Sequence, residues 1–269
     1  MRPPILMLLL AVIIVSGCTS ISGEGFVVSL QADPPRMFSD GFSVLHIDVD
    51  NRQEKSVKNV AVELFDTGLL QGQGCSKVMD RMLPYEFQSL ACTLYAPPMN
   101  ESADAEVNVR TSFESGLSAT QVFEVINEDE YVRRSASGSY TSAQQSYSYG
   151  DRNIRLDIEF SDYPPLVTRP GRQYFVYLTI TNIGSGFISE IRQGDIVIAP
   201  ANPANQRIIH CPVLEQGVGL YANGNAFPRI ACEVMLPPFQ VLSSINADFV
   251  VTIDYEYEVR NTLRISVAR

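Results

Sequence analysis

Apolar and polar residues alternate along most of the chain after residue 24. The stretches FSVLHIDVDN (42–51) and YFVYLTITN (174–182) place an apolar side chain at every second position. A period of two predicts strands with one buried face. The same alternation predicts strands at 57–65, 105–113, 120–125, 154–160, 195–198, 249–257 and 262–267. No stretch of twelve or more residues keeps a helical period, so the sequence predicts an all-β fold.

The two halves of the chain repeat the same order of landmarks. Residues 91–98 read ACTLYAPP and residues 231–238 read ACEVMLPP. The other matching landmarks are Pro34-Pro35 with Pro164-Pro165, Asn51 with Asn182, Cys75 with Cys211, and 120–125 with 262–267. Their offsets drift from 130 to 142 residues, as expected when loops change length between strands of fixed length. We interpret this as a domain duplication that predicts two β-sandwiches, at 25–126 and 152–269.

The N-terminus has the pattern of a secretion signal. Arg2 precedes an apolar run from Ile5 to Val15, which is shorter than the roughly 20 residues that a membrane-spanning helix needs. The run ends in Val-Ser-Gly-Cys, residues 15–18, which resembles the lipobox of prokaryotic lipoproteins. That resemblance implies a signal peptide at 1–17, a lipid on Cys18 and a tether at 18–24. The alternative is an ordinary signal peptide followed by a chance cysteine.

Two motifs resemble the CARDB-type immunoglobulin-like modules of prokaryotic surfaces. They are LTITNIGSGFISEI at 178–191, where a strand ends in Asn-x-Gly, and Leu83-Pro84-Tyr85-Glu86 ahead of the strand at 87–94. The first half departs from the pattern at Asn51-Arg52-Gln53, which lacks the glycine. The resemblance implies two tandem immunoglobulin-like domains of a bacterial or archaeal envelope lipoprotein, in a family known for binding and spacing more than for catalysis.

Four cysteines remain once Cys18 is assigned to lipid, and four cysteines allow three pairings. The match between the halves favours Cys75 with Cys92 and Cys211 with Cys232, one bridge in each sandwich. Neither pair has the CxxC spacing of redox or zinc sites, and His210 alone lies beside a cysteine. We therefore expect structural disulfides in an oxidising compartment.

Charge and composition narrow the function classes. The net charge is −10, without a basic stripe, which argues against a nucleic-acid partner. The acidity is uneven, because residues 24–126 carry 15 acidic and 7 basic side chains whereas residues 152–269 carry 11 and 10. The two histidines, His46 and His210, fall in different halves, so a nucleophile triad is not expected. A hydrolase that uses paired carboxylates stays open as an alternative.

The segment between the predicted sandwiches, 127–151, is rich in Ser and Tyr and predicts a flexible tether. Its Tyr140, Tyr147 and Tyr149 offer an alternative, docking on a partner or on a sheet edge. Its acidic start, Glu128, Asp129 and Glu130, is a weak candidate for a structural calcium site, and otherwise no cofactor is expected. Asn100-Glu101-Ser102 matches the acceptor motif for N-glycosylation.

These features together predict a lipid-anchored, extracytoplasmic binding or assembly module of the cell envelope, without catalytic activity. The expected partners are the membrane, through Cys18, and an envelope protein that contacts a sandwich edge or the linker. A passive envelope spacer is the first alternative. The carboxylate hydrolase is the second.

Overall fold

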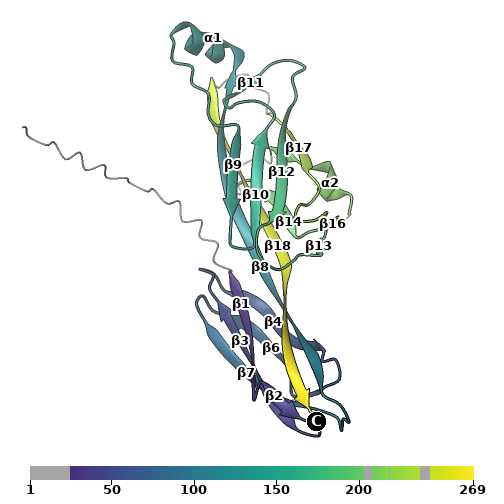
Figure 1. Ribbon diagram of the computed structural model, residues 1–269. Helices are drawn as coiled ribbons and strands as arrows, with labels where there is room; N and C mark the ends of the chain where they lie inside the picture. Colours follow the sequence, from purple (N-terminus) through teal and green to yellow (C-terminus); the bar gives the residue numbers. More distant parts are fainter. Residues whose placement is uncertain (1–24, 203–207, 218, 237–242) are drawn as a thin grey trace, which may run out of the picture.

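The computed structural model describes residues 25–202, 208–217, 219–236 and 243–269. The chain forms two elongated lobes that meet at a narrow waist (Figure 1), and strands dominate both lobes, which confirms the all-β prediction. Lobe 1 is the lower and lobe 2 the upper in that view. Among the described residues, neither helix has the length and apolar content that crossing a bilayer requires.

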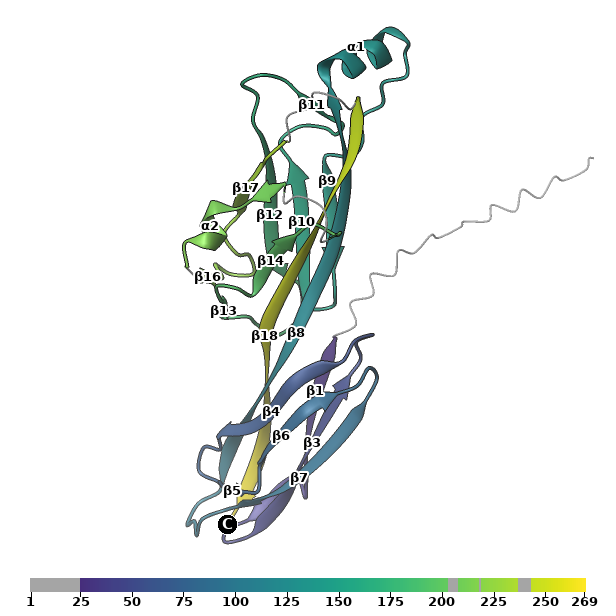
Figure 2. The same ribbon diagram turned by 180° about the vertical axis from the view of Figure 1, so that it is seen from behind.

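Two long strands, β8 (Ala103–Asn127) and β18 (Ser244–Ala268), run through both lobes (Figures 1 and 2). Each contains 25 residues, and they pair antiparallel from Ser244 opposite Ile126 to Val267 opposite Ala103. At about 3.3 Å per residue this ladder is about 80 Å long. The waist lies at its centre, so the backbone hydrogen bonds of a single ladder connect the lobes.

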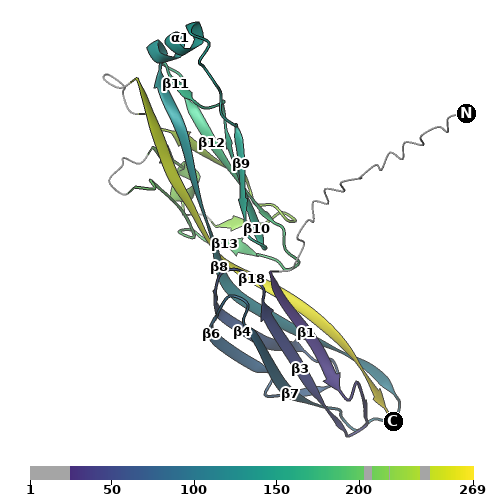
Figure 3. The same ribbon diagram turned by 90° about the vertical axis from the view of Figure 1, so that its left-hand side faces the viewer.

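Lobe 1 places a four-stranded sheet against one half of the ladder (Figure 3). That sheet has the order β1-β3-β7-β5, and β4, β6 and β2 extend the ladder sheet. The strands are β1 (Phe26–Asp33), β2 (Arg36–Phe38), β3 (Phe42–Asn51), β4 (Val57–Asp66), β5 (Gln71–Gln73), β6 (Ser76–Met82) and β7 (Phe87–Tyr95). The ring centroids of Phe26 and Phe113 are 4.3 Å apart, which shows the two layers in contact.

Lobe 2 repeats the arrangement with a five-stranded sheet, β15-β17-β12-β10-β9. Its elements are α1 (Glu128–Ala136), β9 (Ser146–Gly150), β10 (Ile154–Phe160), β11 (Leu166–Thr168), β12 (Tyr174–Asn182), β13 (Glu190–Ile191), β14 (Ile196–Ala199), β15 (Ile209–His210), α2 (Pro212–Glu215), β16 (Leu220–Tyr221) and β17 (Ile230–Val234). β14 and β11 extend the ladder sheet, and β13 pairs with β16. Phe123 of β8 packs on Phe160 at 5.0 Å between ring centroids.

The alternation along the long strands never changes phase. Every odd-numbered residue from Ala105 to Val125 is buried, and so is every odd-numbered residue from Ala247 to Val259. Both short sheets therefore pack on the same face of the ladder. We call that face the inner face. The outer face carries polar pairs, such as Arg264 with Glu106 at 2.7 Å, and remains open to solvent.

The strand registers relate the two halves by a pseudo-twofold axis. Buried Val62 of β4 lies opposite Thr111, and buried Ile196 of β14 lies opposite Ile253, so β8 and β18 correspond at an offset of 142 residues. The short parallel strands give the same offset, because buried Leu166 of β11 faces Val125 and buried Met37 of β2 faces Val267. Combined with the ladder register, this offset puts the axis at the pair Glu114–Glu256.

The lobes do not coincide with the segments predicted from the sequence. The second half of β8, which belongs to segment 25–126, lies in lobe 2, and the second half of β18 completes lobe 1. The stretches 105–113 and 120–125, predicted as separate strands, are one strand, and the same holds for 249–257 and 262–267. The burial phase is unbroken across residues 105–125, so the residues between the two predicted stretches belong to the same strand.

The predicted tether, 127–151, contains α1 and β9. Asn127 caps α1 by accepting a hydrogen bond from the Glu130 amide at 2.8 Å, with acidic residues in the first turn and arginines in the last. β9 pairs with β10, and the Tyr149 hydroxyl donates to the Thr120 carbonyl of β8 at 3.1 Å. The segment thus follows the alternative of docking on a sheet edge. The cap and charge pattern of α1 is visible in the sequence and was overlooked.

Both predicted disulfides are confirmed. Cys75 bonds to Cys92 and Cys211 bonds to Cys232, one bridge in each lobe. Each connects a short edge segment to the central strand that carries the second cysteine, β7 or β17. Side chains bridge the opposite edges, since Asn261 donates to the Val28 carbonyl at 3.0 Å in lobe 1.

Because lobe 1 needs the second half of β18, a fragment of residues 25–126 should not fold. We expect a non-cooperative urea transition by circular dichroism for it. A matched chain in which residues 25–115 continue through Asn-Gly into 255–268 keeps Ser115 opposite Tyr255, rebuilds the missing strand as a hairpin, and should unfold cooperatively. Cooperative unfolding of 25–126 alone would contradict the shared ladder.

Candidate functional site

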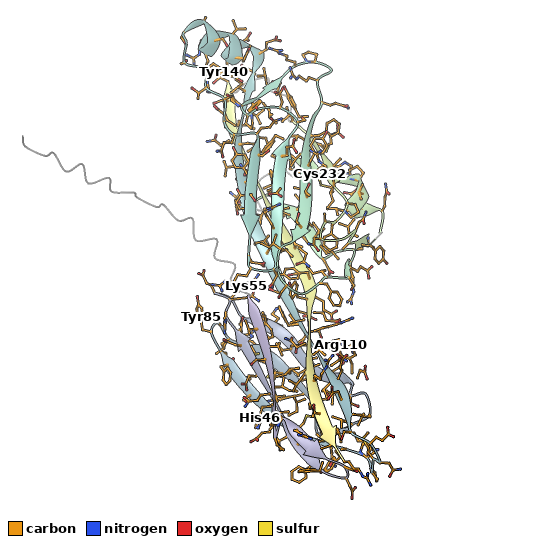
Figure 4. All side chains as sticks on the ribbon, in the orientation of Figure 1. His46, Lys55, Tyr85, Arg110, Tyr140 and Cys232 are labelled. Atoms are coloured by element: carbon orange, nitrogen blue, oxygen red, sulfur yellow. A yellow bond between two sulfur atoms is a disulfide. The ribbon has the colours of Figure 1, made fainter. Side chains whose placement is uncertain are left out.

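A polar network joins the lobes at the waist, where Figure 4 places Lys55. Lys55, in the β3–β4 loop of lobe 1, forms a 2.5 Å ion pair with Asp151, in the β9–β10 turn of lobe 2. Its ammonium also donates to the Gly116 carbonyl of β8. The Tyr255 hydroxyl of β18 donates to Asp151 at 2.7 Å. We call these four residues the waist network.

Tyr255 lies at the centre of the waist network. Its ring is 3% exposed, and the Lys55 ammonium lies 5.8 Å from its centroid. Burial, followed by the nearby Asp151 carboxylate, raises the pKa of Tyr255 far above its usual value. Its hydroxyl therefore stays protonated and remains a hydrogen-bond donor to Asp151.

The loop after β12 makes a second contact across the waist. The Tyr257 hydroxyl accepts the Gly186 amide at 2.8 Å, and Phe187 and Glu258 exchange backbone hydrogen bonds at 2.9 and 3.0 Å. A side chain at Gly184 would place its Cβ only 2.2 Å from the Tyr257 hydroxyl. The close approach of this ring explains the glycine of the Asn-x-Gly motif. Asn182 fixes the loop by donating to the Gly186 carbonyl at 2.7 Å.

The loop after β3 in lobe 1 is built on the equivalent asparagine. Asn51 is fully buried and its amide donates to the Leu83 carbonyl at 2.8 Å and to the Lys55 carbonyl at 3.1 Å. Gln53 takes the place of the glycine, with its backbone amide bonded to the Asn51 side chain. The pseudo-twofold counterpart of Tyr257 is Ser115, so the bulky ring of one half corresponds to a small side chain in the other.

A cleft of about 360 Å³ lies on the outer face of the waist, at the pseudo-twofold axis. Strands β4, β8 and β18 and the segment from β13 to β14 supply its walls. The lining residues are Ser56, Lys58, Glu114, Ser115, Gly116, Ser189, Glu190, Arg192, Asp195, Asp254, Tyr255 and Glu256. Five of them are carboxylates and two are cations, so the cleft is acidic.

Like charges face each other in this waist cleft. Glu114 and Glu256 are directly opposite in the ladder, an arrangement that destabilises a sheet unless cations offset it. Lys58 lies opposite Glu114 in β4, and the Arg192 guanidinium lies 3.6 Å from Glu256. The arrangement suits a cationic group of a ligand. Within the described ranges, no group of three or more His, Cys, Asp or Glu side chains is arranged to hold a metal ion.

The other predicted site residues are scattered. Cys18 lies outside the described residues. Asn100 is exposed in the loop before β8, as glycosylation would require. His46 is half-buried on β3, and His210 lies 3.1 Å from Glu215 in lobe 2, so the histidines do not meet.

The calcium candidates lie in the first turn of α1, where two of the carboxylates pair with arginines. Arg133 and then Arg134 donate to Glu130 and hold its pKa at about 2. Arg169 lies 3.3 Å from Glu128, and Asp129 is exposed. The carboxylates of Glu128 and Glu130 therefore have partners within the protein, while the calcium hypothesis itself stays a prediction.

The sequence did not single out the residues of the waist. Glu114 directly follows the predicted strand 105–113 and Glu256 lies inside the predicted strand 249–257, where an alternating pattern looks like an ordinary solvated face. Only the register, which sets Glu114 opposite Glu256, brings these side chains together.

Comparisons with known proteins give no assignment. No family model and no curated protein matches the chain. A crystal structure of a protein of unknown function from Porphyromonas gingivalis W83 aligns with 78% of this chain and 83% of its own, at 11% identity and a TM-score of 0.23. A similarity this low carries no conclusion about fold or function.

The waist network should couple the lobes energetically. A double-mutant cycle of Lys55→Met and Asp151→Asn in urea unfolding should give a coupling free energy of about 1–2 kcal/mol, because both groups are largely withdrawn from water. The exposed pair Arg264 and Glu106, changed to Gln, is the control and should give a clearly smaller coupling free energy, because solvent screens it. Equal values for the two pairs would contradict a structural role of the waist network.

Proposed function

We propose that the chain is a lipid-anchored, extracytoplasmic binding or assembly module of the cell envelope, without catalytic activity. In this proposal both lobes are immunoglobulin-like sandwiches of the CARDB type, and Cys18 carries the lipid. The observation that carries the binding role is the acidic waist cleft, which lies on a rigid ladder and has unbalanced negative charge. A partner would insert a lysine- or arginine-bearing segment there.

A passive envelope spacer is the second candidate, and the continuous ladder favours it. A rod about 80 Å long, with backbone hydrogen bonds through its centre, would hold a fixed distance without any ligand. A spacer, however, has no use for a cleft that gathers five carboxylates and two cations around the opposed Glu114 and Glu256. That excess of negative charge favours a binding role.

The anchor predicts a defined modification. Metabolic labelling with a fatty acid should label the wild-type chain and leave Cys18→Ala unlabelled, and mass spectrometry should find the lipid on Cys18 at the mature N-terminus. Two or more acyl chains provide stable anchoring, since each buried methylene contributes about 0.8 kcal/mol. An unlabelled wild-type chain with a free thiol at Cys18 would refute the anchor.

The cleft predicts a charge-dependent partner. A photo-crosslinker at Ser189, in the cleft wall, should capture one stoichiometric envelope protein in native membranes, and Glu114→Gln with Glu256→Gln should abolish the capture. The control is Asp104→Asn with Glu106→Gln, which removes two outer-face carboxylates of the same strand far from the cleft. Capture that survives the cleft variant, or that disappears equally with the control, would contradict the proposal.

A further inference from the structure

The turn between β6 and β7 exposes three apolar side chains at the waist end of lobe 1. Leu83, Tyr85 and Phe87 are 56%, 64% and 58% exposed. We call residues 83–87 the waist turn. Figure 4 places Tyr85 at the edge of lobe 1 beside the waist.

The turn lies close to the first described strand. Phe26 begins β1 opposite Asn51 of β3. The backbone amide of Asn51 donates to the Glu86 carbonyl at 2.9 Å. Adjacent strands are about 4.8 Å apart, so the waist turn is about 10 Å from Phe26 across the sheet. The first described strand therefore begins beside these apolar side chains.

The conformation of the waist turn presents Tyr85 to solvent. The Glu86 amide donates to the Leu83 carbonyl at 3.2 Å, and the Glu86 carboxylate accepts the Leu83 amide at 2.6 Å. Pro84 occupies the second position and Tyr85 the third, with φ at +60°. Glycine or asparagine is the usual residue there. The chain keeps an exposed aromatic ring at a position where it strains the backbone.

Lobe 2 contains a corresponding turn without the apolar surface. The Asn182 backbone amide donates to the Asn225 carbonyl as the Asn51 backbone amide does to Glu86, so Gly224, which also has a positive φ, corresponds to Tyr85. Thr181 bridges to Ala226 as Asp50 pairs with Phe87, so the small, exposed Ala226 takes the place of Phe87. The fold therefore does not require apolar residues in this turn. We attribute the exposed apolar side chains of the waist turn to a contact with something outside the protein.

The length of the anchor limits how the rod can stand. Phe26 is eight residues from Cys18, and fully extended residues span at most about 3.6 Å each, so Phe26 lies within about 29 Å of the lipid. The half of β18 in lobe 1, from Glu256 to Ala268, is about 40 Å long at about 3.3 Å per residue. A rod standing upright on the free end of lobe 1 would hold Phe26 beyond the reach of that tether.

We propose that the waist turn is a contact site for the lipid bilayer, so that the protein is held to the membrane at its waist rather than at one end. The proposal rests on the lipid anchor of the proposed function. Tyr85 is suited to the interface, where its ring lies among the acyl chains and its hydroxyl stays hydrated. Leu83 and Phe87 add apolar surface on either side of it.

The absence of Trp from the sequence makes a direct test available. All buried apolar residues of the described core lie between Phe26 and Ala268, so a chain of residues 19–269 keeps the whole core. An N-terminal hexahistidine would hold this chain on vesicles of phosphatidylcholine and phosphatidylglycerol that contain a nickel-chelating lipid. Single-tryptophan variants are then read by emission wavelength and by quenching with acyl-brominated lipid.

In Tyr85→Trp, the emission maximum of the tryptophan should move to a shorter wavelength on the vesicles. The brominated lipid should quench most of this emission. Asn225→Trp, in the matching turn of lobe 2, and Phe42→Trp, at the other end of β3, should do neither. The proposal would be overturned if the emission of either control were quenched while that of Tyr85→Trp was not. It would also be overturned if the vesicles left the emission of all three variants unchanged. The nickel anchor replaces the lipid, so failure of lipidation at Cys18 leaves this test unaffected.

A second variant separates the bilayer contact from folding. Tyr85→Asn suits the positive φ, so thermal stability should be kept or raised, while the amount of full-length chain that washes off membranes at alkaline pH should increase several-fold. The matched control, Asn225→Asp, should change neither value. Equal retention of Tyr85→Asn and wild type would contradict the contact.

Discussion

The antiparallel pairing of β8 with β18 is the constraint on which the rest of the structure depends. Each strand continues from one lobe into the other, so that each lobe is closed by a strand from the other half of the sequence. A duplicated sandwich whose last strands turned back would give two independent domains on a tether. Here the turn is replaced by a straight strand, and the two halves share one ladder.

This pairing determines what meets at the waist. The constant phase of burial directs odd-numbered residues of both strands toward the short sheets, where Lys55, Asp151 and Tyr255 join the lobes. The even-numbered residues face outward, and the pseudo-twofold axis brings Glu114 and Glu256 opposite each other. The same strands therefore create a stabilising polar network on one face and an acidic cleft on the other.

The sequence predicted the elements better than their connections. Strands 154–160 and 174–182 were predicted to the residue, and the matched cysteines gave both disulfides. Alternation reports which side chains are buried, but it does not report which lobe buries them. Ser115 and Gly116 lie between two stretches that were predicted as separate strands, and long-range pairing with β18 keeps them extended. The waist cleft was not predictable for the same reason, since register sets it.

Native-state hydrogen exchange tests the shared ladder most directly. If one ladder joins the lobes, the amides of β8 and β18 at the waist, such as those of Leu117 and Ile253, should exchange with the free energy of global unfolding, as the amides of the lobe cores do. Exchange at the waist that is orders of magnitude faster than in both lobes would mean that the strands separate there. The two halves would then be independent domains, and a single ladder shared by both lobes would be contradicted.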